Sequence, residues 1–190
     1  MQVNPSLPVV IVLAAGRGER FAASGATVPK LQALLAGKPV LEHVLDAVRA
    51  SGLPFHVVQS DASRPGMGDS IAAGVRETLD RADAAGWLIL PGDLPLIRSE
   101  TLRAIALAPP AAVTVPMYQG QHGHPVRFAA NCGPELMRLK GNNGAAHVLR
   151  VHAAMNSVAI VDVDDVGVIT DIDTLDDLAR AESLLAQREI

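Results

Sequence analysis

The sequence holds a single cysteine, no long apolar run and no excess of positive charge, and each shortage excludes a class of protein. With only Cys132, the chain cannot build a framework of internal disulfides, which is typical of a protein from a reducing compartment. We expect Cys132 to be a small apolar core residue. The apolar run at residues 7–15 is far shorter than the roughly 20 residues that span a bilayer, and no basic signal-peptide start precedes it. These features predict a cytoplasmic protein with no membrane partner.

Positive charge is scattered along the chain, and the formal net charge is −4. A protein that holds a phosphate polymer needs a basic face, so we expect no nucleic acid partner. A chain of 190 residues with 49% hydrophobic residues is long enough to bury one substantial core. We therefore expect residues 1–190 to form a single domain whose ligand is a small molecule.

Apolar runs and helical repeats alternate along the first half of the chain. Residues 9–13 form a continuous apolar and β-branched run, which is typical of a strand buried on both faces of a parallel sheet. Residues 55–59 and 87–93 predict two further strands, and residues 37–54 and 68–86 predict helices between them. This order indicates right-handed crossovers and helices on both faces of the sheet. The predicted fold class is α/β, with a single-domain, mostly parallel, Rossmann-like sheet.

The second half of the chain adds further elements to this pattern. Residues 99–108 predict a helix, residues 111–118 predict a strand, and residues 120–128 form a loop that runs into a short strand. An amphipathic helix is expected at residues 173–188, with Thr174 as its N-cap and acidic residues in its first turn.

Two loops are expected to meet at one edge of the sheet. In an open parallel sheet, ligands bind at the carboxyl ends of the strands, and both "AAGRGER" (14–20) and "PGDLP" (91–95) leave such ends. Glycines let backbone N–H groups approach a phosphate, and Arg17, Arg20 and Lys30 can neutralise its charge. The sequence therefore predicts a site for a phosphorylated ligand.

The glycine loop matches neither of the common phosphate-binding motifs. A dinucleotide-binding fingerprint needs a third glycine at the position of Phe21, and no Gly-Lys-Ser/Thr sequence provides a Walker A loop. Gly16 and Gly18 taken alone are equally compatible with a tight turn. A larger set of motifs is needed to assign the loop.

Six segments, in this order, resemble the molybdopterin nucleotidyltransferase family of the MobA/MocA type: "LAAGRGERF", "PKLQALLAGKPVLEHVL", "GMGDSIAAG", "LILPGDLPLI", "GHPVRF" and "TDIDTLDDL". The resemblance spans about residues 9–178 and implies the nucleotide-diphospho-sugar transferase fold. Within the family, the sequence "LAAG" resembles the cytidylyltransferase branch, since guanylyltransferases more usually carry a second glycine in place of Ala15. The resemblance thus implies CTP and molybdenum-bound molybdopterin as substrates, and a molybdenum hydroxylase or its chaperone as the recipient of the product.

The resemblance also assigns roles to individual residues. Nucleotidyl transfer mainly requires that two anions be positioned and that spreading charge be stabilised, so no protein nucleophile is needed. By resemblance, Arg17 and Arg20 grip the leaving phosphates, and Lys30 neutralises the α-phosphate. Solvated loop charge is the alternative for Arg20 and Lys30, and a helix start capped by Asp69 or Ser70 is the alternative for "GMGDS". The implied catalytic residues are Arg20, Lys30 and Asp93, and the implied nucleotide-binding residues are Leu13, Ala14, Ala15, Gly16, Arg17, Gly18, Lys30, Ser70 and Gly92.

Asp93 is the first candidate for a metal ligand. It follows a buried strand and a proline-glycine pair, so its carboxylate is expected to project into the crevice. Mg²⁺ takes one or two carboxylates together with substrate phosphates and water, and we expect it as the cofactor. The second carboxylate is Asp171 or Asp173. We favour Asp173 because it lies just before the terminal helix, although it can equally act with Thr174 in capping that helix.

The acceptor side departs from the family pattern. Where the family often reads Gly-Asp-x-Gly-Ala-Arg, this chain reads "GNNGAA", with Asn142 at the acid and Ala146 at the arginine. His122 and His124 flank a glycine, and because Mg²⁺ does not favour imidazole, we interpret His124 as an acceptor-site or loop-shaping residue. The predicted acceptor-binding residues are His124 and Asn142.

The sequence leaves the identity of the acceptor open. One alternative is transfer of another nucleotidyl group, such as guanylyl, or transfer to a different phosphorylated acceptor. A second alternative is a non-catalytic chaperone that binds molybdenum cofactor and nucleotide and delivers them to a hydroxylase. Lys30, Asp93 and Asp173 weigh against this second alternative, because binding alone does not need a complete charge and metal set.

Overall fold

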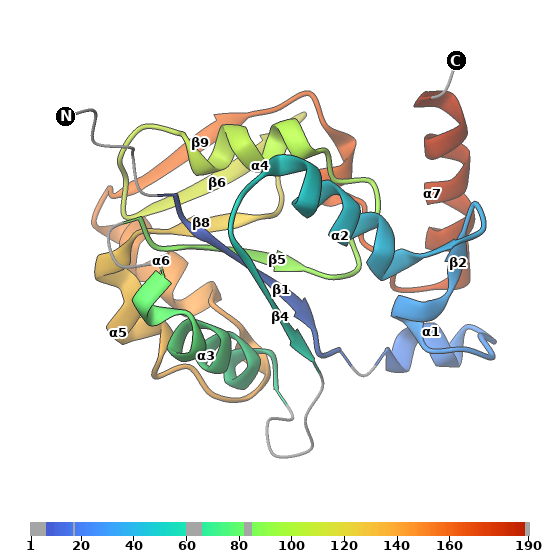
Figure 1. The fold of residues 1–190 in the computed structure, drawn as a ribbon, viewed down its shortest axis with the longest axis horizontal. Helices are drawn as coiled ribbons and strands as arrows, with labels where there is room; N and C mark the ends of the chain where they lie inside the picture. The colour runs from blue at the N-terminus through green and yellow to red at the C-terminus, as the bar shows by residue number, and fades with distance from the viewer. Residues whose placement is uncertain (1–6, 17, 60–65, 82–84, 189–190) are drawn as a thin grey trace.

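A computed structural model of the chain describes residues 7–16, 18–59, 66–81 and 85–188. Within these ranges, seven strands form one sheet. Its order is β4 (Phe55–Gln59), β1 (Val9–Ala14), β5 (Trp87–Pro91), β8 (Val126–Phe128), β6 (Val113–Tyr118) and β7 (Gln121–His122), and β9 (Val158–Asp162) also pairs with β6 (Figure 1). β1 runs parallel to β4 and β5, and β6 runs parallel to β9, whereas β8 is antiparallel to both β5 and β6. The predicted, mostly parallel sheet is confirmed.

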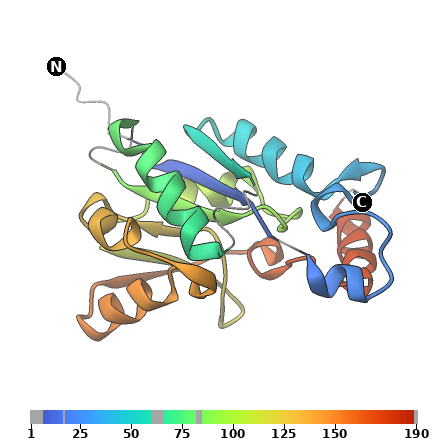
Figure 2. The same cartoon turned by 90° about the horizontal axis from the view of Figure 1, so that it is seen from below.

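Helices cover both faces of the sheet, as Figure 2 shows from below. Along β1 the side chains alternate between two hydrophobic cores, with Val9 and Ile11 in one and Val10 and Val12 in the other. The continuous apolar run of this strand is explained by its burial on both faces. The first core is covered by α3 (Met67–Glu77), α5 (Gly133–Leu136) and α6 (Ala146–Ala154), and the second by α2 (Val40–Ser51) and α4 (Ser99–Ala106).

A third hydrophobic cluster lies beside the sheet and joins segments from the two ends of the chain. It packs α7 (Leu175–Arg188) against α1 (Glu19–Ala23) and the hairpin of β2 (Leu34–Leu35) and β3 (Lys38–Pro39), at the right of Figure 1. Its buried members include Phe21, Leu35 and Ala181. The short helix η1 (Lys30–Gln32) lies between α1 and β2 in the chain, so this cluster holds the segment that carries Lys30.

Some boundaries and elements differ from the sequence prediction. The strand predicted at residues 87–93 ends at Pro91, and Asp93 lies in the loop that follows. The helix predicted at residues 68–86 ends at Glu77 and is followed by a short 3₁₀ turn, η2 (Leu79–Arg81). The sequence analysis also missed α6 and β9. Both are largely exposed or half-buried, so their apolar residues show no clear period.

The environment of Cys132 and the length of the helices bear on two further expectations. Cys132 ends the short helix η3 (Ala130–Cys132) and is fully buried in the first core, as predicted. Burial raises the pKa of its thiol to about 11, so the thiol stays protonated at neutral pH. None of the helices in the described ranges is long and apolar enough to span a bilayer.

Candidate functional site

A cavity of about 710 Å³ opens where the carboxyl ends of β1 and β5 lie side by side. Its wall comes from the loops after these two strands, the start of α3, the β7 hairpin and the segment before α7. Open α/β sheets bind ligands at this position, because the loops of neighbouring parallel strands gather there. The residues predicted from the sequence that line the cavity are Leu13, Ala15, Gly16, Gly18, Arg20, Lys30, Ser70, Asp93, His124, Asn142 and Asp173.

Two of the predicted nucleotide-binding residues that the structure describes are not in this wall. Ala14 and Gly92 adjoin it without lining it, and Arg17 falls outside the described residues. Gly92 has a packing role: its N–H donates to the Leu13 carbonyl at 3.0 Å, and a Cβ would lie 2.9 Å from that oxygen. Gly92 therefore holds the end of β5 against β1, which places Asp93 beside the glycine loop.

The loop after β1 passes close to Lys30 at Gly18. This glycine has a φ of 62°, in the left-handed region that residues with a side chain rarely adopt. A Cβ there would lie 3.3 Å from the Cβ of Lys30. Both the backbone conformation and the close approach therefore favour glycine at this position, and they bring the Lys30 side chain to the loop.

Lys30 connects the two acids that the sequence analysis proposed as metal ligands. Its Nζ lies 2.6 Å from Oδ2 of Asp93 and 3.1 Å from Oδ1 of Asp173. Arg20 adds a second cation, with its Nη1 2.7 Å from Oδ2 of Asp173. Lys30 and both acids are largely buried, whereas the Arg20 side chain is 77% exposed. The Lys30 pairs are therefore screened by solvent much less than the Arg20 pair.

The protonation of Lys30 is set by opposing effects. Burial by itself lowers the pKa of the Lys30 ammonium, but the charge of Asp93 and hydrogen bonds to Asp93 and Asp173 raise the pKa above its ordinary value. A raised lysine pKa means that the group is charged at neutral pH. Its favourable contribution to folding is lost only as the pH rises through and above the ordinary lysine value.

The turn before α7 places Asp173 in the cavity wall. Thr174 caps the helix as predicted, because its Oγ1 accepts the Asp177 N–H at 3.2 Å. The Asp177 carboxylate in turn accepts from the Thr174 hydroxyl at 2.8 Å and from the Asp173 N–H at 3.2 Å. The Ile172 N–H donates to the Asp93 carbonyl at 3.0 Å, which joins the two segments that carry the acids. The Asp173 carboxylate is not used in these capping bonds and pairs with Lys30 instead.

Asp171 brings a third carboxylate to the cavity wall. Burial raises the pKa of the Asp171 carboxyl, and the charges of Asp173 and Asp93 raise this pKa further, although a hydrogen bond from the backbone N–H of Asp171 to its own carboxylate opposes the change. Asp173, in contrast, is paired with two cations. The group of acids thus retains unneutralised negative charge that attracts a cation.

These acids suit a hard cation such as Mg²⁺ in combination with a phosphorylated substrate. Oδ1 of Asp93 is buried and has no hydrogen-bond partner among the described residues. In the same part of the chain, no three acidic, histidine or cysteine side chains are grouped so that they hold a metal ion by themselves. A cation bound by Asp93 and Asp173 would take its remaining ligands from phosphate oxygens and water, which is the usual arrangement for Mg²⁺.

His124 and Asn142 reach the same cavity from different elements. Asn142 lies in the exposed turn η4 (Gly141–Asn143), and His124 follows the β7 hairpin. The His124 N–H donates at 2.9 Å to the carbonyl of Val168, in η5 (Val166–Ile169). Nδ1 of His124 is buried without a partner in the described part of the chain, and burial lowers the pKa of this imidazole although the charge of Asp93 raises it. His124 is therefore a neutral hydrogen-bonding group at neutral pH.

Sequence reasoning missed several residues of the wall. Most of them lie within the motifs quoted above and close in the chain to a residue that was predicted, but no role was assigned to them. This proximity is the signal that could have found them, because neighbouring side chains of one loop often reach the same cavity. The missed residues are Glu19, Leu31, Met67, Pro91, Leu94, Gln121, Val168 and Ile169.

Comparison with known sequences places the chain in a family. Residues 10–158 match the model of the MobA-like NTP transferase domain. The purine catabolism protein PucB of Bacillus subtilis is 28% identical over 188 residues, which cover 86% of this chain and 90% of PucB. The bifunctional protein GlmU of Chromohalobacter salexigens is 36% identical over 116 residues, which cover 50% of this chain but only 24% of GlmU. This chain therefore corresponds to a minor part of GlmU.

Several solved structures share the fold of this chain. Rv0371c from Mycobacterium tuberculosis has a TM-score of 0.70 and 28% identity, with 93% of this chain and 98% of Rv0371c covered, and another structure of Rv0371c contains manganese. The molybdopterin-guanine dinucleotide biosynthesis protein A of Archaeoglobus fulgidus, at 20% identity and a TM-score of 0.62, covers 94% of this chain and 99% of its own and shows the fold alone. The predicted fold class and resemblance are confirmed, and the chain is a nucleotidyltransferase that belongs to the family of MobA-like NTP transferase domains.

Proposed function

We propose that this nucleotidyltransferase moves a cytidylyl group from CTP to molybdenum-bound molybdopterin, with Mg²⁺ as its metal ion and pyrophosphate as the second product. The observation that carries the proposal is the buried cluster of Lys30, Asp93 and Asp173 beside the glycine loop. A triphosphate with a divalent cation needs groups of both signs, because the phosphates and the metal must each be matched by opposite charge.

In the proposed reaction, a phosphate oxygen of the acceptor attacks the α-phosphorus of CTP, and the bond to the leaving pyrophosphate breaks in line. Lys30 would neutralise the α-phosphate. Arg20, at the exposed rim, would contact the leaving phosphates, as would Arg17 in the loop. Asp93 and Asp173 would hold the Mg²⁺, which when bound neutralises the charge of the phosphates. The manganese in the Rv0371c structure supports a divalent cation in proteins of this fold.

The choice of CTP rests on Ala15. This residue lines the cavity beside Leu13 and Gly16, at the position where guanylyltransferases more usually carry glycine. A methyl group takes up space that glycine leaves open, and a purine base needs more room than cytosine. Ala15 therefore favours the smaller base.

The choice of molybdopterin rests on the family resemblance, and a second candidate is a different phosphorylated acceptor. Asn142 and Ala146 favour that candidate, because they stand where the family often has an acid and an arginine. For the molybdopterin reaction, the product would pass to a molybdenum hydroxylase or its chaperone. A cytoplasmic location is part of the proposal and is supported by the single cysteine of the chain.

Pyrophosphate release tests the proposal. The protein is incubated with Mg²⁺ and with CTP, GTP, ATP or UTP in turn, with and without molybdenum-bound molybdopterin. We expect pyrophosphate with CTP only when the acceptor is present, and slower release with GTP. Equal rates with CTP and GTP would refute the nucleotide assignment, and release that does not depend on molybdopterin would refute the acceptor.

A pair of neighbouring variants tests the reason for the CTP preference. Ala15→Gly removes the methyl group from the cavity wall, so the rate with GTP relative to CTP should rise by about tenfold, an energy difference of about 1.4 kcal/mol. Ala14→Gly is the matched control, because Ala14 precedes it in the chain but does not line the cavity. An equal change in both variants would show that the effect comes from the backbone and not from the methyl group.

A further inference from the structure

Two walls of the cavity come into backbone contact where the start of α3 meets the turn η4. A Cβ at Gly66 would lie 2.3 Å from the carbonyl atoms of Gly141, and one at Gly68 would lie 3.0 Å from the carbonyl oxygens of Gly141 and Lys140. Neither Gly66 nor Gly68 therefore has room for a Cβ. The separation of the two segments is set by backbone contact and by whatever hydrogen bonds join them.

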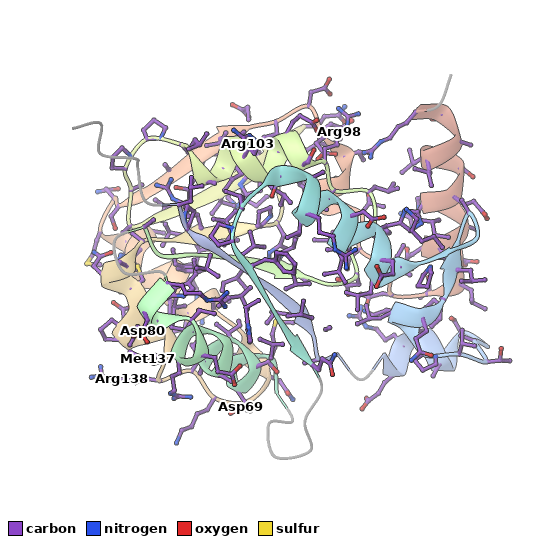
Figure 3. All side chains as sticks on the ribbon, viewed as in Figure 1. Asp69, Asp80, Arg98, Arg103, Met137 and Arg138 are labelled. Carbon is purple, nitrogen blue, oxygen red and sulfur yellow. The ribbon has the colours of Figure 1, made fainter. Side chains whose placement is uncertain are left out.

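Asp69 supplies that hydrogen bonding with a single oxygen. Its Oδ2 accepts the N–H of Gly66, the N-cap of α3, at 3.2 Å, and the N–H of Gly141 at 3.0 Å. Figure 3 labels Asp69 on α3, beside the segment that leads from α5 to α6. The sequence analysis treated Asp69 as a possible helix cap, and the structure adds a second bond that joins the helix to η4.

The two joined segments differ in how firmly the rest of the protein holds them. α3 packs tightly on the sheet, because a Cβ at Gly74 would lie 2.8 Å from side-chain atoms of both Ile11 and Val58. The residues of η4 are exposed. A bond from a fixed helix to an exposed turn mainly restrains the turn, so loss of the Asp69 oxygen should free η4 and leave α3 in place.

We infer that Asp69 is a positioning residue: its carboxylate fixes the turn that carries Asn142 relative to the helix that carries Ser70. Ser70 and Asn142 line the same cavity, whereas Asp69 does not line it. By resemblance, Ser70 belongs to the nucleotide side and Asn142 to the acceptor side. This inference rests on the proposed function, because the turn matters to the reaction only if an acceptor binds against it. A displacement of about 1 Å between two substrates can cost a transfer reaction 100-fold in rate.

Kinetics with three variants separates positioning from stability. Asp69→Leu keeps the size of the side chain but removes the accepting oxygen, so KM for molybdenum-bound molybdopterin should rise about tenfold while the Kd for CTP with Mg²⁺ stays within about twofold. Asp69→Asn retains one oxygen that can accept both bonds, so it should restore KM to near the wild-type value. Thr78→Val is the matched control at the other end of α3, since it removes the 2.9 Å bond from the Trp87 indole N–H without touching the cavity.

Hydrogen exchange gives a readout that needs no acceptor. Amides of residues 139–145 should exchange at least about tenfold faster in Asp69→Leu than in the wild type, and at near wild-type rates in Asp69→Asn and Thr78→Val. If the wild type releases no pyrophosphate with molybdopterin, the proposed function fails, but the exchange rates still decide whether Asp69 fixes the turn. Unchanged exchange in Asp69→Leu, or an equal rise in KM for Thr78→Val, would overturn the inference.

Discussion

Under the proposed function, Lys30 and the metal ion would compete for the same pair of carboxylates. In the structure its ammonium lies between Asp93 and Asp173, within 2.6 and 3.1 Å of their oxygens, where a cation held by both acids would lie. A bound triphosphate offers Lys30 another anionic partner, and a metal ion can then replace the ammonium between the acids. Nucleotide and metal are therefore expected to support each other's binding.

Substitution of Lys30 should strengthen metal binding in the protein without nucleotide. Lys30→Met keeps the length of the side chain but removes the ammonium, so Asp93 and Asp173 are left with less counter-charge and should bind Mn²⁺ about tenfold more tightly. Electron paramagnetic resonance of free Mn²⁺ measures this affinity. Lys38→Met is the matched control, because Lys38 pairs with Asp46 on the exposed surface of α2. Equal or weaker Mn²⁺ binding in Lys30→Met would contradict the competition.

Loss of the Asp93 charge should stop the reaction and spare the fold. Asp93→Asn keeps the shape of the side chain, so its melting temperature should stay close to that of the wild type, while the Mg²⁺-dependent rate of pyrophosphate release should fall on the order of 100-fold or more. Asp46→Asn, on the exposed surface of α2, is the control and should retain the wild-type rate. Near-normal turnover in Asp93→Asn would exclude Asp93 as the metal ligand.

At the scale of elements, the antiparallel strand β8 contributes an arginine that binds the carbonyl groups at the C-terminus of α4. The buried Arg127 guanidinium donates to the carbonyls of Ala106 at 3.0 Å, Ala108 at 2.9 Å and Pro109 at 3.1 Å, at and just beyond the end of α4. Burial lowers the pKa of Arg127, although an arginine still remains charged at neutral pH. Cations are favourable at the C-terminus of a helix, where the last carbonyls lack helical partners.

Arg127→Met should therefore destabilise the protein without changing its chemistry. The methionine preserves much of the apolar stem but leaves several carbonyls without their donor, so the free energy of unfolding should fall by about 3 kcal/mol. Urea unfolding measures this loss. Arg49→Met, which removes an exposed arginine paired with Glu42 and Asp46 on α2, should leave the free energy of unfolding nearly unchanged. A similar loss in the two variants would show that the helix end does not depend on Arg127.

At the scale of the whole molecule, one buried carboxylate links α7 to η5 and α4. Asp165 precedes η5 and accepts bonds from the backbone N–H of Arg98 at 2.9 Å, the Thr101 hydroxyl at 2.8 Å and the Arg188 guanidinium at 3.0 Å. Figure 3 labels Arg98, which is the N-cap of α4. Arg188 also donates to the Leu96 carbonyl at 2.6 Å. These bonds join α4, η5 and α7, so the C-terminal helix is expected to unfold together with the core.

A single cooperative transition is the expected result for a chain that forms one domain. Trp87, the single tryptophan, reports on the first core by fluorescence, while far-UV circular dichroism includes α7. Arg188→Met should shift the fluorescence and dichroism midpoints of urea unfolding together to lower urea concentration. The free energy of unfolding should fall by about 2 kcal/mol, because the variant leaves the buried Asp165 with one hydrogen bond fewer. Arg180→Met, at an exposed pair on α7, is the control. A dichroism transition that precedes the fluorescence transition would contradict the single-domain prediction.

The sequence by itself determined the central strands, the helices between them and the loops that carry the motifs. A strand such as β1 that is buried on both faces requires a continuous apolar run, and a helix buried on one face requires apolar residues with a period of 3.6 residues. Both patterns are therefore visible in the local sequence. The ordered motifs further indicated the family by resemblance, and the position of several of them after strands indicated where a ligand binds. Half-buried elements such as β9 and α6 leave no such pattern and were missed.

Tertiary structure alone decided how the functional residues are paired. Lys30 meets Asp173, which lies 143 positions later in the chain, and Asp69 meets Gly141, 72 positions later. Gly92, which is predicted to bind the nucleotide, also holds the end of β5 against β1. Local patterns report which face of an element is buried, whereas contacts between distant segments depend on how whole elements pack, and a single sequence carries no local record of that packing.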